Sequence, residues 1–542
     1  MTRALRGVAA AAVLISALTL LARVAGFGRT LVFTNAVGAG STADTYLAAN
    51  NVPNIVFEVV AGGALASLVV PMLAGGIAAG DGEQVRRTAS ALLGWTLLVL
   101  VPLAALLALF ASPIAAALLG AAGSDPAKVE LAARFLLVFA PQVVLYGIAV
   151  VLTGVLQAHR RFAGPAVAPL LSSVVVAAAY LLFAGIGGDR SVGVLSRPAE
   201  LVLGVGTTLG VAALALSLVL PLRRLGLGLR PSLRFPVGAA PRVRRLAVAG
   251  VLTLAGQQLV AVIAIRLAND GAPDGTQTAY FAGMTVFLLP WAALAVPLAT
   301  SAYPGMSERA ELGDEAGYRR ALAPAAVLTV VASALAAAGL VAVSGPLARV
   351  FLASAADRDQ AEALAPTIVA FAPGLLGYGL VALLSRALYA RGLWRAPTAC
   401  VAGGWLVAVA ADVLLARLVP AADRAVALGA GHSIGVTVAG GALLVVVRRT
   451  AGAGALAGLA RTGFPALVAG ALGGAAGLLT ARALGADPVP DGSVLAAIGT
   501  GIVAGGVVLA VAGAVMMGTA RVPLRTAVRG LRSTEGAEVA GG

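Results

Sequence analysis

Two arginines in the first long apolar segment have the type and spacing to bind an anion. Arg23 and Arg29 flank Gly26-Phe27-Gly28, and all of them lie in an apolar run over residues 6–33. An arginine at the centre of a bilayer costs about 2.5–3.5 kcal/mol on insertion scales, so such a residue normally faces a watery cavity or a bound anion. On a helix the two arginines point about 120° apart and lie about 9 Å apart along the axis, so both side chains can converge on one polyanionic group. The alternative is that one or both extend to a membrane interface.

The composition predicts the elements that position these arginines. Of the 542 residues, 60% are hydrophobic and 11% are charged, whereas soluble proteins carry about 25% charged residues. This excludes a soluble globular protein and predicts an all-α polytopic membrane protein. The net charge of +15 comes from arginines in short loops between apolar runs, which is typical of orientation signals and of contact with anionic lipids rather than of nucleic-acid binding. A single cysteine, Cys400, excludes an intramolecular disulfide.

Apolar runs recur along the whole chain at the length of a membrane-spanning helix, about 20 residues. We count fourteen such runs, at 6–33, 47–75, 88–119, 131–157, 164–186, 199–222, 245–268, 276–304, 320–344, 363–390, 396–419, 424–447, 463–484 and 493–517. The first two are long enough to be bent or tilted, which their glycines and Pro53 allow.

Positive charge alternates between successive loops. With the N-terminus inside, the cytoplasmic segments hold 26 of the 38 Lys and Arg residues, the outward loops hold nine, and Arg23, Arg29 and Arg266 lie within spans. Cytoplasmic loops normally carry this excess, so both termini are predicted to be cytoplasmic and the number of spans to be even. The N-terminal segment has features of a signal peptide, but the many spans behind it favour an uncleaved first span.

The chain also repeats itself at an offset of 232 residues. Phe139-Ala140-Pro141 through Tyr146-Gly147 matches Phe371-Ala372-Pro373 through Tyr378-Gly379. The repeating unit therefore contains six spans and keeps its orientation, which predicts two parallel lobes with substrate held between them. The predicted organisation is an N-lobe (1–222), a basic cytoplasmic linker (223–244), a C-lobe (245–449), two further spans (450–519) and a basic, disordered cytoplasmic tail (520–542). In the linker, alternating Leu and Arg predict interfacial segments on an anionic leaflet, and a merely solvated linker is the alternative.

Several short motifs resemble those of one family. R-V-A-G-F-G-R at Arg23 to Arg29, G-A-G at Gly38 to Gly40, Asp44 and the pair Pro53-Asn54 resemble the opening of the MurJ (MviN) proteins. The run from Ala140 to Gly147 is similar to the fourth span of that family. These are fourteen-span members of the MOP exporter superfamily, taken to flip lipid II, the lipid-linked precursor of peptidoglycan, across the bacterial cytoplasmic membrane.

This resemblance implies a mechanism and roles for individual residues. Two lobes would rock about a central cationic cavity that admits the pyrophosphate-disaccharide head while the polyprenyl tail stays in lipid. Arg23 and Arg29 would bind the diphosphate, since arginine holds phosphate in a two-pronged geometry. Asp44 would lie near the outer mouth of the cavity as a gating or ion-pairing group, and Asn54 belongs to the same motif.

Two departures from the family pattern concern the charge of that cavity. Many relatives carry arginines where this chain has Phe57-Glu58, and many carry an arginine in span 8, where Met284 to Leu289 has no charge. Arg266, late in span 7, could compensate or could extend to the interface. Glu58 could pair with Arg23 or Arg29, or act as a protonatable coupling group.

The resemblance also raises the question of a coupling ion, because some members bind sodium between spans 7, 11 and 12. Asp412 is the one acid deep in span 11, and the side chains that could lie near it are those of Gln257, Gln258, His432 and Ser433. The family's asparagine one turn earlier is Ala408 here, which has no side-chain oxygen. Asp412 is therefore a sodium ligand together with Gln257 and Ser433, or instead a structural acid or a proton carrier.

The sequence favours a transporter and leaves alternatives open. We find no P-loop, dinucleotide fingerprint, HExxH or serine-elbow motif, so we expect no enzymatic activity and no cofactor, and transport driven by Na⁺, H⁺ or the membrane potential. The first hypothesis is a lipid II flippase of peptidoglycan biosynthesis. The alternatives are an exporter of another polyprenyl-linked glycan or of a drug, and a non-transporting scaffold for cell-wall enzymes.

Overall fold

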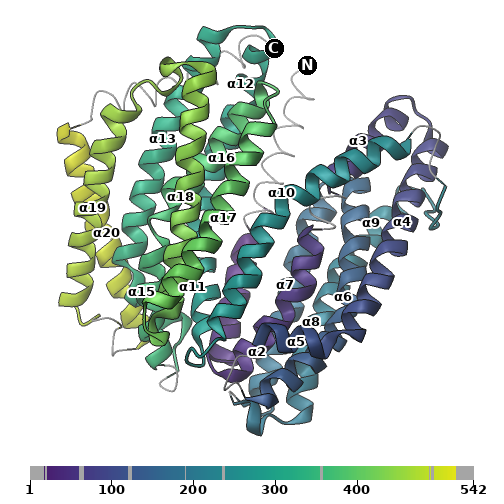
Figure 1. Cartoon of the computed structure of the whole chain (residues 1–542), viewed down its shortest axis with the longest axis horizontal. Helices are drawn as coiled ribbons and strands as arrows, with labels where there is room; N and C mark the ends of the chain where they lie inside the picture. The colour runs from purple at the N-terminus through teal and green to yellow at the C-terminus, as the bar shows by residue number, and fades with distance from the viewer. Residues whose placement is uncertain are drawn as a thin grey trace. The chain divides into compact units, whose positions relative to one another are not determined.

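The computed structural model describes residues 18, 21–59, 66–119, 125–189, 191–234, 239–354, 358–486, 489 and 493–519. The start of the first predicted span and the predicted disordered tail, 520–542, lie outside these residues. The chain divides into two compact units, Met1–Thr278 and Ala279–Gly542, and the elements of both are helices (Figure 1). The all-α fold class is confirmed.

Unit 1 begins with a helix over residues 21–36. Its further elements are α2 (Ser41–Val56), α3 (Ala66–Ala78), α4 (Gly82–Leu109), α5 (Ala111–Leu119), α6 (Pro126–Ala158), α7 (Ala163–Gly185), η2 (Val192–Val194), α8 (Arg197–Ser217), α9 (Val219–Arg223) and α10 (Ala239–Ala268). Helix α6 is central in this unit, since it packs against α2, α3, α4, α5 and α8.

Helix α11 (Thr276–Pro290) starts at the end of unit 1 and continues into unit 2. The further elements of unit 2 are η3 (Trp291–Ala295), α12 (Val296–Glu311), α13 (Glu315–Ala342), α14 (Ser344–Phe351), α15 (Arg358–Phe371), α16 (Gly374–Ala390), α17 (Arg395–Leu418), η5 (Ala421–Asp423), α18 (Arg424–Ala451), η6 (Ala453–Leu456), α19 (Leu459–Ala483) and α20 (Val494–Thr519). Helix α18 packs against α15, α16 and α17, while α13 packs against α12, α16 and α19.

The long helices begin at polar caps in the loops. Asp81 accepts a hydrogen bond from the Gln84 backbone N–H at the start of α4 (2.8 Å), and Asp314 accepts one from Gly317 at the start of α13 (2.7 Å). Asp125 caps α6 in the same way, with Pro126 as the first helical residue. These side chains satisfy N–H groups that have no partner inside the helix, so each apolar run starts at a defined residue.

Most of the predicted spans have a helical counterpart. Among the described residues, 10 helices are long and apolar enough to cross a membrane, and α15 with α16 forms an eleventh, bent by 45°. Helix α10 adds a shorter apolar stretch, Leu254–Ala268. The predicted spans from 88–119 to 493–517 all fall on these helices, whereas the first two are interrupted by residues outside the described part. The exact number of fourteen therefore stays a prediction.

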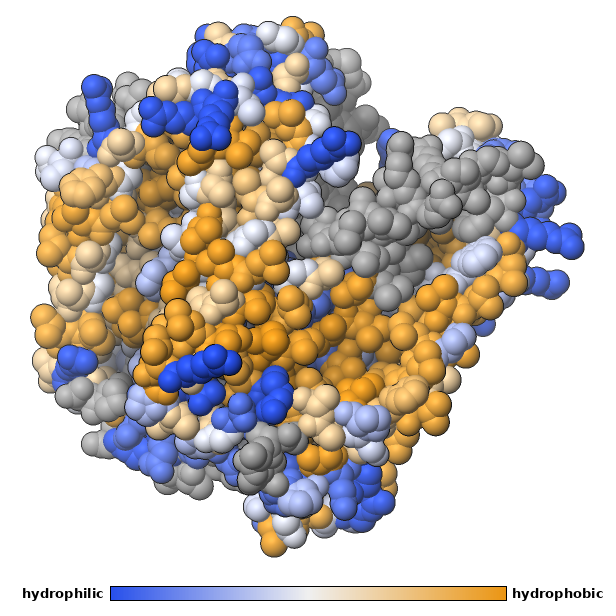
Figure 2. Space-filling model, in the orientation of Figure 1, coloured by the Kyte–Doolittle hydropathy of each residue, from blue (hydrophilic) through white to orange (hydrophobic). Residues whose placement is uncertain are grey.

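The surfaces of these helices are apolar where lipid would contact them. Figure 2 shows hydrophobic residues over the middle of the visible face of each unit and hydrophilic residues near the helix ends. The exposed apolar side chains include Leu98 and Val99 of α4 and Leu509 of α20, which are 48%, 49% and 67% exposed. Such surfaces would be unstable in water. The chain is a multi-pass membrane protein.

Candidate functional site

Arg23 and Arg29 lie on one continuous helix, over residues 21–36. The glycines between them produce no break, and a Cβ at Gly26 or Gly28 would meet no described atom within 4 Å. Arg23 is exposed and Arg29 is half-buried. The two arginines therefore keep the helical spacing that the sequence predicts, but they differ in how far they enter the protein.

Arg29 lies one helical turn before Phe33, which packs into a buried tyrosine cluster. Phe33 is buried, and its ring lies 5.4 Å from that of Tyr46 and 5.1 Å from that of Tyr180. The helix that carries Arg29 is therefore held against this cluster through Phe33.

The tyrosine cluster is held together by a closed set of hydrogen bonds. The hydroxyl of Tyr46 lies 2.8 Å from that of Tyr180 and 2.7 Å from that of Thr207, and Thr207 donates to the carbonyl of Leu203. Phe139 packs edge-on against Tyr46 at 5.8 Å. Helices α2, α6, α7 and α8 all contribute to this network, which joins the four helices. The motifs of the sequence did not predict it; the available signal was Tyr180 within an apolar run and Tyr46 directly before one.

Asp44 is 3% exposed and its partners are neutral donors. Its carboxylate accepts hydrogen bonds from the backbone N–H of Gly275 (2.8 Å), the backbone N–H of Thr278 (2.9 Å) and the hydroxyl of Thr278 (2.7 Å). The carboxylate therefore caps the amino end of α11, where the helix dipole favours a negative charge. Nearby, Lys128 of α6 pairs with Asp274 in the loop that leads to α11. Two acid contacts thus tie this loop to α2 and α6.

Asn54 and Glu58 lie at the end of α2. Asn54 is half-buried and donates its side-chain N–H to the carbonyl of Asn50 (2.9 Å). Glu58 is exposed and lies in a short π-helical turn over 57–59, where the ring of Phe57 stacks on Tyr146 at 4.6 Å. Glu58 makes no ion pair with an arginine within the described residues.

Arg266 lies near the carboxyl end of α10. Its guanidinium is 3.7 Å from the carboxylate of Asp270, one turn further on, and its side chain is 34% exposed. A lone pair of this kind at a helix end contributes little to stability. Its Nη1 is buried and has no hydrogen-bond partner among the described residues.

The candidate sodium ligands fall into two groups. Gln257 is exposed and Gln258 is buried, both on α10 of unit 1. Asp412, His432 and Ser433 lie in unit 2, on α17 and α18. Within unit 2, the described residues contain no group of three His, Cys, Asp or Glu side chains that could hold a metal ion.

Asp412 is completely buried, and neither of its carboxylate oxygens has a hydrogen-bond partner among the described residues. It lies against α18, where a Cβ at Gly431 would be 2.0 Å from its Oδ1. The next residue, His432, is enclosed by the rings of Phe287, Phe371 and Trp405, and neither ring nitrogen is hydrogen-bonded within the described part.

Two further positions near Asp412 bear on a cation site, Ser433 and Ala408. The hydroxyl of Ser433 donates to the carbonyls of Ala370 (2.7 Å) and Phe371 (3.0 Å). Ala408 is fully buried, and a Cβ at Gly435 would lie 2.4 Å from its Cβ. A larger residue such as asparagine at 408 would collide with α18. This close helix packing accounts for the missing family asparagine.

The fold defines a class of protein: a multi-pass helical membrane protein with the architecture of two solved transporters. The structure is similar to one described as "Lipid II flippase MurJ, inward closed conformation", with a TM-score of 0.71 and 19% identity over 92% of this chain and 98% of that one. It is also similar to an inward-facing multidrug resistance MATE family transporter of the MOP superfamily, with a TM-score of 0.65 and 14% identity over 81% of this chain and 94% of that one.

The sequence comparisons define the family. A probable lipid II flippase MurJ of Vibrio cholerae is 24% identical over 70% of this chain and 72% of its own length. The lipid II flippase MurJ of Burkholderia cenocepacia is 25% identical over 77% of this chain and 80% of its own. Residues 33–484 match the model of the family described as lipid II flippase MurJ. The chain belongs to that family, as its opening motifs predicted. Arg23 and Arg29 precede the matched segment.

Proposed function

We propose that this protein is a flippase that carries lipid II across the bacterial cytoplasmic membrane, with both termini on the cytoplasmic side. The observation that carries the proposal is the family match over residues 33–484. It is supported by the names of the relatives, which are flippases and hence transporters rather than enzymes. The distribution of arginines between alternate loops supports the orientation.

In this proposal Arg29 and Arg23 bind the diphosphate of the lipid head. A diphosphate carries about two negative charges, and a guanidinium can form two parallel hydrogen bonds to it. The helix that carries Arg29 is held against the tyrosine cluster through Phe33, one turn further on. Arg23 is exposed and so keeps the freedom to move with the head group. Glu58 and Asn54 line the same end of α2, where an acid limits the net positive charge.

Asp44 has a gating role in this proposal. Alternating access requires contacts that can be broken and remade, and the carboxylate of Asp44 joins α2 to the amino end of α11 by three hydrogen bonds. Their rupture would release the loop that precedes α11. Arg266, paired weakly with Asp270, adds positive charge at the end of α10 without a defined ligand.

For coupling, the residues favour a proton over sodium at Asp412. A buried carboxylate without a hydrogen-bond partner is costly unless it is protonated or holds a cation. Sodium would require further oxygen ligands, for which Gln257 and Ser433 are the candidates, while Ala408, at the position of the family's asparagine, has no side-chain oxygen. A proton requires none. The coupling ion would itself be transported, and the membrane potential would contribute to the driving force.

Complementation tests the function. A bacterial host depleted of its lipid II flippase would express the parent chain, Arg23→Ala, Arg29→Ala or, as a matched control, Arg161→Ala, which replaces an exposed arginine in the loop between α6 and α7. We expect rescue by the parent and by Arg161→Ala, and loss of rescue in both cavity variants at equal membrane abundance. Rescue by all four would exclude the head-group role of the arginines. A well-expressed parent that fails to rescue would point to another lipid-linked glycan or to a scaffold for cell-wall enzymes.

A further inference from the structure

The linker segment that follows α9 is anchored along the amino-terminal half of α4. The backbone N–H of Ser232 donates to the carbonyl of Ser90 (3.0 Å), and the indole N–H of Trp95 donates to the carbonyl of Leu233 (3.0 Å). Gly94 makes this approach possible, because a Cβ there would lie 2.1 Å from the Ser232 carbonyl oxygen. Three leucines of the linker pack against buried apolar clusters of unit 1: Leu225, Leu227 and Leu229. The segment is therefore a fixed wall and not a free tether.

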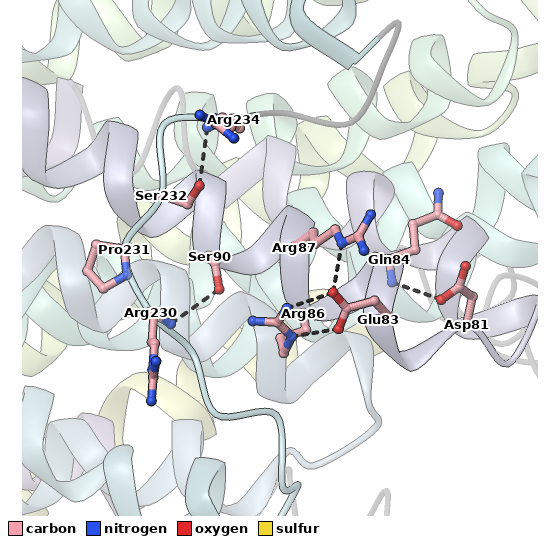
Figure 3. Close-up of a pocket in the computed structure, with 10 residues that line it drawn as sticks. All are labelled: Asp81, Glu83, Gln84, Arg86, Arg87, Ser90, Arg230, Pro231, Ser232 and Arg234. Carbon is pink, nitrogen blue, oxygen red and sulfur yellow. Dashed lines mark hydrogen bonds and ion pairs between the residues drawn. The ribbon is translucent and has the colours of Figure 1, made fainter.

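This wall and the start of α4 enclose a cavity of about 800 Å³ that is rich in arginine (Figure 3). Arg86 and Arg87 of α4 and Arg230 and Arg234 of the linker line it, together with two acids, Asp81 and Glu83. The lining therefore carries a net charge of +2, from four arginines and two carboxylates.

The acids do not neutralise the cavity. Glu83 is shared between Arg86 (2.6 Å) and Arg87 (2.7 Å), and Asp81 caps α4 through the Gln84 N–H. Within the part of the chain that the structure describes, the guanidinium groups of Arg230 and Arg234 make no ion pair. Figure 3 shows both of these side chains apart from Glu83, with only their backbone N–H groups engaged by Ser90 and Ser232. Two free guanidiniums beside a helix amino end favour an anion with several oxygen atoms.

The surroundings of the cavity indicate where that anion comes from. Trp95 is 42% exposed and lies about two helical turns beyond Arg87, and tryptophan is enriched at membrane interfaces. The next residues on α4 include exposed Leu98, Val99 and Val101, at 48%, 49% and 49%. A charged cavity followed by an interfacial tryptophan and an apolar stripe matches the order of phosphate, glycerol and acyl chain in a phospholipid.

We propose that this cavity is a binding site for the phosphate group of an anionic phospholipid, whose acyl chains lie along the exposed apolar face of α4. The site is separate from Arg23 and Arg29 and does not depend on lipid II being the substrate. A bound lipid would hold the linker, through Arg230 and Arg234, against α4, through Arg86 and Arg87.

A lipid titration of the purified full-length chain tests the proposal. The protein in neutral detergent is titrated with phosphatidylglycerol, and bound lipid is counted by native mass spectrometry. The test variant is the double substitution Arg230→Gln with Arg234→Gln. The matched control is Arg223→Gln with Arg224→Gln, which removes the same charge from exposed residues of the same segment that do not line the cavity. Thermal unfolding confirms that both variants are folded.

We expect the test variant to lose about tenfold or more in affinity for phosphatidylglycerol, because it removes two charge-assisted contacts, and the control to change by less than about twofold. Equal losses in both variants, or no loss in the test variant, would overturn the proposal. Phosphatidylcholine and inorganic phosphate serve as further probes. Competition by inorganic phosphate as strong as that by phosphatidylglycerol would overturn the lipid assignment in favour of a soluble phosphate.

Discussion

The two copies of the nine-residue repeat have the same Phe-Ala-Pro start but form different structures. In unit 1 the helix α6 continues through Pro141, whereas in unit 2 the chain bends by 45° between α15 and α16 at Pro373. In both copies a hydroxyl from the last helix of the repeat donates to the carbonyl just before the phenylalanine: Thr208 to Val138 (2.9 Å) and Ser433 to Ala370 (2.7 Å). The same hydroxyl contact therefore accompanies a continuous helix in one copy and a bend in the other.

The residue after the proline differs between the copies and accounts for the bend. Gln142 in unit 1 is fully buried and donates its side-chain N–H to Thr208 (3.0 Å), which supports a straight helix. Its counterpart Gly374 has no side chain, and a Cβ there would lie 2.8 Å from the Ser433 hydroxyl. Glycine after proline allows a bend, and close packing against α18 then maintains it. Glutamine or glycine at this one position of the repeat therefore distinguishes the straight helix α6 from the bent pair α15 and α16.

A second difference between the two units concerns the buried polar side chains at positions that correspond in the repeat. At the same offset of 232, Tyr180 of α7 corresponds to Asp412 of α17. The Tyr180 hydroxyl is bonded to Tyr46 at 2.8 Å, whereas Asp412 has no partner in the described part of unit 2. Unit 1 therefore carries the satisfied network, typical of a structural core, and unit 2 carries the unsatisfied acid, typical of a functional group.

The largest expected effect on stability comes from replacing a glycine of unit 2 by the residue at the corresponding position of unit 1. Gly377→Leu introduces the counterpart of Leu145, and already a Cβ at 377 would lie 2.4 Å from the Val436 carbonyl oxygen. Because the obstacle is backbone of α18, we expect a loss of about 3 kcal/mol or more in the free energy of unfolding. Thermal unfolding and membrane abundance measure it. The control is Gly441→Ala, since a Cβ there meets nothing within 4 Å; equal behaviour of the two variants would contradict the close packing.

An intermediate effect is expected at the matched pair Tyr180 and Asp412. Tyr180→Phe removes a partner of Tyr46 and should lower the free energy of unfolding by about 1–2 kcal/mol. Asp412→Asn removes a buried, unpaired acid and should leave stability unchanged or raise it, while abolishing rescue in the complementation test. Thermal unfolding and rescue are scored together. A destabilised Asp412→Asn, or one that still rescues, would show that the acid is structural.

The smallest effect on stability is expected from the two prolines. Pro141→Ala and Pro373→Ala should each change the free energy of unfolding by less than about 1 kcal/mol, because membrane helices accommodate proline through local adjustment of neighbouring groups. Only Pro373→Ala should slow transport, since it would straighten and stiffen the bend between α15 and α16. Distances between spin labels on α15 and α16, measured by pulsed electron resonance, report the bend. An unchanged bend in Pro373→Ala would assign it to Gly374 alone.

The sequence predicted what depends on local patterns. Apolar runs and loop arginines predicted the fold class and the helices from α4 onward, and the offset of 232 predicted matched positions. The different conformations of Pro141 and Pro373 could not be predicted, because both lie in the same local motif and the outcome depends on packing against α8 or α18. The partners of Asp44 were missed for a related reason, since they lie more than 200 residues away.

The separation between Asp44 and its donors has a consequence for biosynthesis. The carboxylate and Gly275 are 231 residues apart, and translation proceeds at about 5–20 residues per second, so roughly 10–50 seconds pass between the synthesis of the acceptor and that of its donors. During that interval the growing chain must keep Asp44 hydrated or protonated, because a bare charge cannot rest in lipid. Chains stalled on the ribosome before and after Thr278 should differ in the reactivity of a cysteine placed at position 44. The amino-terminal half of this protein is therefore completed only when the start of α11, in the eighth predicted span, emerges from the ribosome.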